Sequence, residues 1–406
     1  MTYVVRPGDS LWAIARRFGI TVQELLAANP QIRDPASIQP GLRLRIPVQP
    51  GQQYVVQPGD TLWAIARRFG LSVAALQRAN PGVDPLRLRV GQRLVIPSAA
   101  PPAPTPTPAP AGEIVIPREN YGYDEMMTDL TRLRERYPFI QVTTIGESVM
   151  GRSIPAVRIG AGAREVHYNG SFHAHEWITT PLLMKFIEVY LRAYTRGERI
   201  GQFDIPRLFR ETSLWVVPMV NPDGVEIVQN GIRPDHPYYD LVMRALAGRP
   251  LSVWAANIRG VDLNNQFPAN WEQEARRGPP GPAPRDYAGP SPLSEPESQA
   301  MATFTRNRNF RLVAAFHSQG EVIFWGFEGY EPPETERIVQ IFAEASGYTP
   351  IRYAGSSAGY KDWFEQEWRR PGFTVEVGKG VNPLPFGQFW EIWGENIGIM
   401  LAGLAV

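Results

Sequence analysis

A duplicated stretch near the start of the chain constrains its architecture more than any other feature. The run from Tyr3 to Gly19 returns almost unchanged from Tyr54 to Gly70, each time with Pro-Gly-Asp, then Ser or Thr, then Leu-Trp. Such self-similarity indicates two copies of one folding unit. In each copy a Tyr-Val-Val strand precedes a Pro-Gly turn, and Asp9 or Asp60 follows as a helix cap. Apolar residues then recur at helical spacing up to the terminal glycine.

A second helix and a closing strand complete each unit. Thr21 and Glu24 have the spacing of a capping box, which predicts the start of that helix. Asn-Pro pairs end the helix in both copies, and the runs at 42–47 and 93–97 predict a second strand. We therefore expect two small strand–helix–helix–strand modules.

These units resemble the LysM module over residues 3–47 and 54–97. The resemblance implies binding of glycans that contain N-acetylglucosamine, such as peptidoglycan and chitin. The glycan is then expected against the turn after the first strand and the loop before the second. The residues at those places are Gly8, Asp9, Ser10, Asn29, Pro30, Gly59, Asp60, Thr61, Asn80 and Pro81. For any one of these residues, a role in the turn or the helix cap is the simpler explanation. For the two modules taken together, glycan binding is favoured.

A proline-rich segment separates these modules from the rest of the chain. Residues 98–112 alternate proline with small residues, which favours an extended, semi-rigid spacer and cannot build a core. We therefore expect LysM modules at 1–49 and 52–97, a linker at 98–112 and one further domain at 113–406. A length of 406 residues agrees with more than one domain.

The region 113–406 alternates apolar runs with amphipathic segments, which predicts a mixed α/β domain. Helices are expected at 123–137 and 179–193, and a hairpin at 142–159 that turns at 150–152. Further strands are expected at 165–172, 213–220, 311–316, 322–325 and 373–377. Many Pro and Gly residues at 277–292 predict a long surface loop, and such loops are often functional.

Three of these strand-like runs end at residues that bind metals or transfer protons. His173 and Glu176 are spaced as His-x-x-Glu just after the first run, and His317 follows the run at 311–316. A catalytic zinc ion takes three such N and O ligands and keeps one position open. Glu376 lies in a third apolar strand, where an unpaired carboxylate is costly, and could act as the base beside the metal.

The same region resembles the zinc carboxypeptidase family over most of 115–400. The resemblance rests on ordered motifs: His173-x-x-Glu176-Trp, Asn-Pro-Asp-Gly at 221–224, Gly-Val-Asp-Leu-Asn at 260–264, Phe-His-Ser at 316–318, Asp-Trp at 362–363 and Phe-Thr-Val-Glu at 373–376. It implies a mixed sheet flanked by helices and one zinc ion held by His173, Glu176 and His317, with Glu376 as general base and acid. His175, between two ligands, either competes as a ligand, lines the site or orients a partner.

Two departures from the family pattern concern the substrate. The family follows Asp-x-Asn with an arginine that clamps the terminal carboxylate of the substrate, but Asn264 is followed here by Asn265, so the clamp is absent. The family places a second arginine after a tryptophan, to polarise the scissile carbonyl. Here Ala255 follows Trp254, and Arg259 is the expected replacement, unless another group fills that role.

Lysine is rare in this chain, and two of its three lysines flank active-site motifs. Lys361 precedes Asp362-Trp363, and Lys379 follows Glu376. The surroundings of both lysines resemble the γ-D-glutamyl-meso-diaminopimelate peptidase branch of the family, whose members also carry LysM modules. The resemblance implies that both lysines bind carboxylates of the substrate, Lys361 on the diaminopimelate side; a solvated surface lysine is the alternative. Tyr353 corresponds to the mobile capping tyrosine of carboxypeptidases, with a spacing that differs by one residue.

Composition excludes several other classes of protein. The formal net charge of +1 gives no reason to expect nucleic acid as a partner, and no apolar segment is long enough for membrane insertion. The absence of cysteine excludes disulfides and thiolate metal sites. The LysM modules favour an extracellular or wall-associated location. Because no signal peptide is visible, a cytoplasmic location stays open.

Together these features predict a zinc peptidase that cleaves stem peptides of peptidoglycan, at the γ-D-glutamyl-meso-diaminopimelate bond, and is held on glycan by its LysM modules. One alternative is a metallocarboxypeptidase of relaxed specificity, against which the missing arginine at 265 argues. A wall-binding protein with an inactive peptidase domain is the other, against which the intact His173, Glu176, His317 and Glu376 argue.

Overall fold

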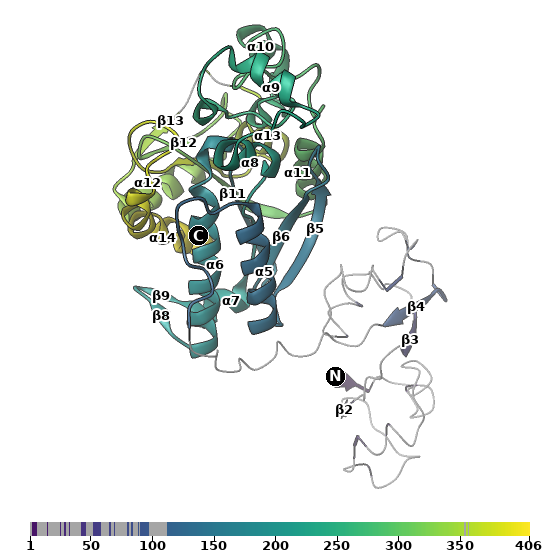
Figure 1. Cartoon of the computed structure of the whole chain (residues 1–406). Helices are drawn as coiled ribbons and strands as arrows, with labels where there is room; N and C mark the ends of the chain where they lie inside the picture. Colours follow the sequence, from purple (N-terminus) through teal and green to yellow (C-terminus); the bar gives the residue numbers. More distant parts are fainter. Residues whose placement is uncertain are drawn as a thin grey trace. The chain divides into compact units, whose positions relative to one another are not determined.

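The computed structural model consists of two compact units, Met1–Thr105 and Pro106–Val406, and each is described by itself (Figure 1). In the second unit the structure describes residues 112–352, 355 and 357–406. In the first it describes residues 2–5, 14, 25, 28–29, 32, 42–45, 52–57, 65, 69, 79–80, 83, 88 and 90–96.

The described residues of the first unit include two antiparallel strand pairs. Strand β1 (Thr2–Val4) pairs with β2 (Arg43–Arg45), and β3 (Gln52–Val55) pairs with β4 (Arg93–Ile96). This pairing confirms the first and last strands predicted for each duplicated module. Ile14, Leu25 and Ile65, which were predicted on helices, are helical and fully buried. Phe69, near the end of the predicted first helix of the second copy, is buried, and its N–H donates to the carbonyl of Ile65 at 3.1 Å. Most of the other residues of the predicted helices lie outside the described residues.

The second unit is built on one mixed eight-stranded sheet. Its strands are β5 (Gln141–Glu147), β6 (Ser153–Ile159), β7 (Arg164–Gly170), β10 (Thr212–Val217), β11 (Phe310–His317), β12 (Val322–Trp325), β13 (Thr349–Arg352) and β14 (Gly372–Glu376). The order across the sheet is β13-β12-β14-β11-β7-β10-β6-β5. The central strands β14, β11, β7 and β10 run parallel, so their carboxyl ends meet at one edge of the sheet. A short hairpin, β8 (Arg199–Ile200) and β9 (Phe203–Asp204), lies outside this sheet.

Both faces of the sheet are covered because successive side chains of a strand point to opposite sides. On β11, Leu312, Ala314 and Phe316 join one buried cluster, whereas Val313 and Ala315 join another. The first cluster lies beneath α5 (Tyr123–Arg136), α6 (Thr179–Arg196), α7 (Ile205–Glu211), α12 (Glu334–Ser346) and α14 (Phe389–Ala405). The second lies beneath α11 (Pro296–Arg306) and α13 (Tyr360–Trp368).

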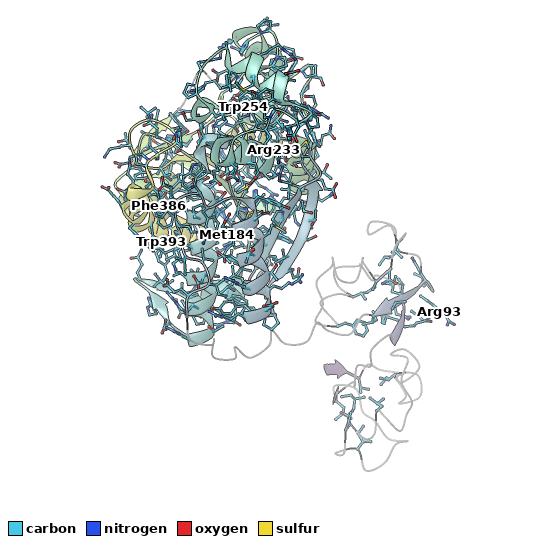
Figure 2. The ribbon with its side chains drawn as sticks, viewed as in Figure 1. Arg93, Met184, Arg233, Trp254, Phe386 and Trp393 are labelled. Atoms are coloured by element: carbon cyan, nitrogen blue, oxygen red, sulfur yellow. The ribbon has the colours of Figure 1, made fainter. Side chains whose placement is uncertain are left out.

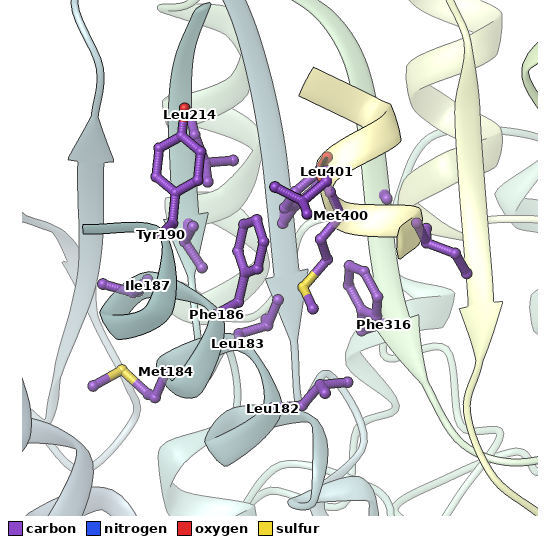
Figure 3. Packing of buried hydrophobic residues seen from close by; sticks show 14 of the residues in the cluster. Leu182, Leu183, Met184, Phe186, Ile187, Tyr190, Leu214, Phe316, Met400 and Leu401 are labelled. Atoms are coloured by element: carbon purple, nitrogen blue, oxygen red, sulfur yellow. Dashed lines mark hydrogen bonds between the residues drawn. The ribbon is translucent and has the colours of Figure 1, made fainter. Parts of the chain in front are cut away.

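The larger cluster fixes α6 and α14 on the sheet (Figure 3). Phe186 of α6, Phe316 of β11 and Met400 of α14 are fully buried there, each worth about 2–3 kcal/mol of hydrophobic free energy. Tyr168 of β7 donates a hydrogen bond from its hydroxyl to the carbonyl of Met400 at 2.7 Å. A side chain at Gly403 would lie 2.2 Å from that hydroxyl, so this contact requires glycine.

A third, smaller cluster surrounds the fully buried Trp254 (Figure 2). It joins α8 (Pro222–Asn230), α9 (Tyr239–Leu246) and the 3₁₀ turns η1 (Ala174–Glu176) and η2 (Leu251–Val253). Ala174 belongs to this cluster, so the packing holds the residue between His173 and His175 in place.

The remaining elements are α10 (Trp271–Arg277) and the 3₁₀ turns η3 (Leu263–Asn265) and η4 (Phe386–Gln388). Between α10 and α11 the chain forms no helix or strand, which confirms the predicted loop at 277–292. Pro284 and Ala288 of this loop are nevertheless buried, so it packs against the domain. In the described part of the chain, no helix is both long and apolar enough to cross a bilayer.

Candidate metal centre and active site

The carboxyl ends of three adjacent parallel strands bring the predicted metal residues together. His317 is the last residue of β11, and it lies opposite Glu376, the last residue of β14. On the other side of β11, Gly170 ends β7 opposite Phe316, and the chain continues directly into the His173 turn. Residues far apart in sequence therefore meet at one edge of the sheet.

A 3₁₀ turn orients the His-x-x-Glu pair. His173 caps η1 and Glu176 ends it, and residues three apart lie on the same side of a 3₁₀ helix. Glu176 is also fixed through its carbonyl oxygen, which accepts a hydrogen bond from the hydroxyl of Thr179 at 2.9 Å. Thr179 in turn accepts a hydrogen bond from the backbone N–H of Ser171 at 2.9 Å, which closes the loop between β7 and α6.

Asn221 of the Asn-Pro-Asp-Gly motif ties this loop to its neighbours. Its backbone N–H donates to the carbonyl of Ser171 at 3.0 Å, and its amide nitrogen donates to the carbonyl of Phe172 at 3.1 Å. The same amide nitrogen reaches the carbonyls of Ala255 and Ala256. The motif therefore supports the metal loop and is not itself part of the metal cluster.

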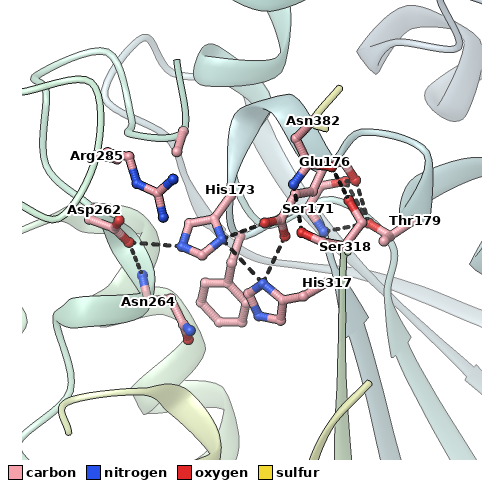
Figure 4. Close-up of polar contacts among 12 residues, drawn as sticks. Ser171, His173, Glu176, Thr179, Asp262, Asn264, Arg285, His317, Ser318 and Asn382 are labelled. Carbon is pink, nitrogen blue, oxygen red and sulfur yellow. Dashed lines mark hydrogen bonds and ion pairs between the residues drawn. The ribbon is translucent and has the colours of Figure 1, made fainter. Parts of the chain in front are cut away.

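The polar atoms of His173, Glu176 and His317 converge on one point (Figure 4). The two carboxylate oxygens of Glu176 lie 2.9 Å from His173 Nδ1 and 2.8 Å from His317 Nδ1. The two Nδ1 atoms face each other at 3.2 Å. Two imidazole nitrogens and a carboxylate directed at a common point are the donor set that zinc prefers. The arrangement fits a single metal ion, as predicted.

Asp262 holds His173 from behind. Its Oδ1 lies 3.0 Å from His173 Nε2, and its carboxylate also accepts the backbone N–H groups of Asn264 and Asp286. Burial alone lowers the pKa of His173, but the charges of Glu176 and Asp262 outweigh this and raise that pKa well above its usual value. A proton on Nε2 leaves the lone pair of Nδ1 directed at the cluster, which is the tautomer that a metal ligand needs.

Glu376 is half-buried beside this cluster. Burial and, next, the negative charge of Glu176 raise its pKa well above the usual range of a glutamate. A carboxylate at such a position can accept and return a proton. Ser318 and Asn382 join the loops that follow β11 and β14, since the Asn382 amide donates to the carbonyl of Ser318 at 2.6 Å.

Lys361 does not lie where a substrate could reach it, so its predicted role is wrong. Its side chain is 5% exposed, and its ammonium donates to the carbonyl of Gly326 at 2.8 Å. It also pairs with Asp362 at 2.7 Å and with Glu365 at 3.3 Å. Lys361 is therefore a buried structural cation on α13.

Contact of Arg259 with the scissile carbonyl stays a prediction. Its guanidinium lies 3.5 Å from Glu295 and binds Tyr238, and that hydrogen bond followed by the charge of Glu295 raises its pKa. Lys379 is 72% exposed and pairs with Glu321, and its substrate-binding role stays a prediction.

The remaining substrate-binding predictions have different outcomes. The side-chain oxygen of Asn264 accepts the backbone N–H of Tyr360 at 3.2 Å, so this residue anchors the start of α13. Asn265 is half-buried and His175 is 7% exposed, and burial lowers the pKa of His175 to about 4. Contact of Asn264, Asn265 and His175 with substrate stays a prediction. Tyr353 lies outside the described residues.

Two of the predicted glycan contacts are wrong. Asn29 is fully buried and donates to the carbonyl of Leu25 at 2.7 Å. Asn80 uses both ends of its amide on the backbone of Val95, at 2.7 and 2.8 Å. Both asparagines therefore stabilise their modules from inside. The other predicted contacts, Gly8, Asp9, Ser10, Pro30, Gly59, Asp60, Thr61 and Pro81, lie outside the described residues.

Two residues of the site escaped prediction as functional groups. Asp262 stood within a recognised motif, but nothing in the sequence showed that it would lie behind His173. Arg285 lies beside Asp262 and His173 in Figure 4, although it belongs to the irregular loop between α10 and α11. No periodicity or spacing signals a single arginine in such a loop.

Comparisons with known proteins agree with this geometry. Residues 126–396 match the zinc carboxypeptidase family, and residues 3–47 and 54–97 match the LysM domain. The chain is 47% identical over 411 residues to gamma-D-glutamyl-L-diamino acid endopeptidase 1 of Lysinibacillus sphaericus, with 100% of both chains covered. It is 43% identical over 290 residues to the uncharacterized protein YqgT of Bacillus subtilis (strain 168), covering 70% of this chain and 77% of that one.

Solved structures show the same fold. Thrombin-activatable fibrinolysis inhibitor matches with a TM-score of 0.56 at 18% identity, over 70% of this chain and 73% of that one. Carboxypeptidase A from Helicoverpa armigera matches with a TM-score of 0.50 at 23% identity, over 70% and 74%. With the His-Glu-His cluster and the sequence matches, these likenesses identify the chain as a zinc metallopeptidase that belongs to the zinc carboxypeptidase family and carries two LysM domains.

Proposed function

We propose that this metallopeptidase hydrolyses the γ-D-glutamyl–diamino acid bond in stem peptides of peptidoglycan, and that meso-diaminopimelate is its preferred diamino acid. The cluster of His173, Glu176 and His317 with Glu376 beside it carries the hydrolytic part of the proposal. The substrate is suggested by the relative from Lysinibacillus sphaericus, which shares the whole length of the chain. The uncharged Asn265 supports an internal bond over a terminal one, since no clamp for a terminal carboxylate is present there.

The residues of the site have different roles in the reaction. His173, Glu176 and His317 would hold the zinc ion, which when bound supplies Lewis-acid polarisation of a carbonyl and lowers the pKa of water. Glu376 takes a proton from the attacking water and passes it to the leaving amine. Asp262 keeps the ring of His173 in the required orientation and tautomer.

The test is turnover of defined peptides by the zinc-loaded full chain, followed by mass spectrometry of the products. L-Ala-γ-D-Glu-meso-diaminopimelate extended by D-Ala should be cut after the glutamyl residue, while the isomer linked through the α-carboxylate should stay intact. A Glu376→Gln variant with equal zinc content is the inactive control.

Two results would contradict the proposal. Release of C-terminal residues from ordinary peptides at a comparable rate would favour a metallocarboxypeptidase of relaxed specificity. Absence of any turnover at full zinc loading would favour a wall-binding protein with an inactive peptidase domain.

We also propose that the LysM modules, with boundaries at 1–49 and 52–97, anchor the enzyme on peptidoglycan at the cell wall through the linker at 98–112. Tethering raises the local concentration of substrate without any new contact in the active site. Removal of residues 1–105, which form a compact unit, should abolish sedimentation with insoluble peptidoglycan and leave cleavage of a soluble peptide nearly unchanged. Equal sedimentation of the truncated and full chains would exclude this anchoring role.

A further inference from the structure

Arg285 is held at the metal centre by its own stretch of backbone. The carbonyl of Pro284 accepts the N–H groups of Ala255 and Ala256 at 2.7 and 2.9 Å, and the carbonyl of Ala255 accepts the N–H of Ala174 in the metal loop at 2.9 Å. On its other side, the N–H of Asp286 donates to Oδ2 of Asp262 at 2.9 Å. The loop thus has a fixed position beside the metal residues, although it has no regular secondary structure.

The guanidinium of Arg285 is available to a ligand. Its Nε lies 3.2 Å from Asp286, and in the described part of the chain its two terminal nitrogens have no hydrogen-bond partner. The side chain is 61% exposed and lies beside Asp262 and His173 (Figure 4).

The other basic candidates around the site are already engaged within the described residues. Lys361 is buried against Gly326 and two carboxylates, Arg259 pairs with Glu295, and Lys379 pairs with Glu321. Arg277 donates to the carbonyl of Gly355. Arg285 also pairs with a carboxylate, but only through Nε, so it combines a position beside the metal residues with two terminal nitrogens that have no partner among the described residues.

The proposed substrate has one anion that does not depend on the diamino acid. A glutamate joined through its γ-carboxyl keeps its α-carboxylate free. The α-carboxylate of the diamino acid forms the next peptide bond when the peptide continues. A second carboxylate is present in diaminopimelate but not in lysine. An enzyme for this linkage can therefore recognise it through the glutamyl α-carboxylate, and two terminal nitrogens of a guanidinium match a carboxylate in a bidentate pair.

We propose that Arg285 binds the free α-carboxylate of the γ-linked glutamyl residue and thereby selects γ-glutamyl peptides. This inference rests on the proposed function and names the group that recognises its substrate.

The test compares two peptides that differ only at that carboxylate, γ-D-glutamyl and γ-D-isoglutaminyl, the α-amide. The wild type should cleave the carboxylate peptide with a kcat/KM about tenfold or more above that of the amide, as expected for one charge-assisted pair. Arg285→Gln should cleave the carboxylate peptide with a lower kcat/KM and the amide peptide with an unchanged kcat/KM, so the preference should disappear. Arg276→Gln, at an exposed arginine of the adjacent α10, should keep it.

A binding measurement gives a readout that does not require turnover. Calorimetry with the zinc-loaded Glu376→Gln protein should show the same preference for the carboxylate peptide, and adding Arg285→Gln should remove it. Equal zinc content and equal melting temperature of the variants exclude a misfolded loop.

Two outcomes overturn the inference. If Arg285→Gln keeps the wild-type ratio between the two peptides, another group recognises the carboxylate. If it slows both peptides equally, Arg285 acts on the scissile carbonyl or on the metal loop. Failure of the proposed function would appear separately, as no cleavage by the wild type, and the binding comparison would still decide the role of Arg285.

Discussion

Replacement of Asp262 by asparagine tests whether the metal centre depends on a residue that never touches the metal. Asp262 is 2% exposed and serves three donors: Nε2 of His173 at 3.0 Å and the backbone N–H groups of Asn264 and Asp286 at 3.1 and 2.9 Å. Asparagine has only one acceptor oxygen. Its amide nitrogen must therefore face either the N–H of Asp286 or the ring of His173, and each choice leaves a buried donor unpaired.

The two choices predict a measurable loss. Removing the carboxylate behind a metal-bound histidine typically costs 10- to 100-fold in metal affinity, which corresponds to about 1.4–2.7 kcal/mol. The unpaired donor adds a loss of about 1–3 kcal/mol in the free energy of unfolding. We therefore expect Asp262→Asn to bind zinc at least tenfold more weakly and to melt at a lower temperature in both the zinc-loaded and the zinc-free state.

Competition with a chelator at pH 7 measures the zinc affinity of wild type and variant. Asp223→Asn is the matched control, since Asp223 is fully buried and bound to Arg152 at 2.6 Å and to the N–H of Met150 at 2.9 Å, outside the metal cluster. It should lose stability and keep its zinc affinity. Zinc affinity of Asp262→Asn within threefold of wild type would refute the orienting role of Asp262.

Three further predictions follow from individual groups. His317→Ala should lose most bound zinc by elemental analysis, whereas Glu376→Gln should keep zinc and lose turnover by about 10²- to 10⁴-fold. Lys361→Met should lower the free energy of unfolding by about 3 kcal/mol in urea titrations, because it leaves Glu365 buried without its cation, and should not change substrate preference. For Glu297, burial and then the nearby Asp223 raise the pKa to about 7, so the folded state binds a proton more tightly than the unfolded state. Stability should therefore fall by about 3 kcal/mol as the pH rises from about 4.5 to 7, and Glu297→Gln should remove that slope.

Each of these predictions has a result that would contradict it. Equal zinc content in His317→Ala and wild type would remove His317 from the site. A changed ratio between diaminopimelate and lysine peptides in Lys361→Met would restore its role in recognition. An unchanged pH slope in Glu297→Gln would mean that another buried group titrates there.

The metal centre was predictable because each of its residues ends an apolar run. His317 and Glu376 are the last residues of β11 and β14, and His173 follows β7 by three residues. Parallel strands bring such ends to one edge of a sheet, so three short sequence signals define one site without any knowledge of the loops. The hairpin β5–β6 was equally clear, since Gly151 marks its turn.

The groups that act on these residues were not predictable. Asp262 reaches His173 across 89 positions of sequence, and Arg285 depends on backbone hydrogen bonds between two irregular segments. Such contacts have no periodicity, because loops are shaped by turns and individual hydrogen bonds and not by a repeating face. The loop at 277–292 could be identified from its Pro and Gly residues, but not the direction of any side chain within it.

The lysines show why a compositional bias needs the structure before it indicates function. Lys185 and Lys361 are both buried, and each pairs with a glutamate on its own helix and donates to one backbone carbonyl. An ammonium has three donors on a compact head, so one carbonyl and one or two carboxylates satisfy it inside a protein, whereas the five donors of a guanidinium need more partners. Two of the three lysines of this chain therefore lie where a cation is buried, whereas Lys379 is 72% exposed. The scarcity of lysine drew attention to these positions. The internal partners of Lys185 and Lys361 show that both side chains stabilise the fold. At Arg285 the opposite holds, since a common residue whose two terminal nitrogens have no partner among the described residues lies beside the metal ligands.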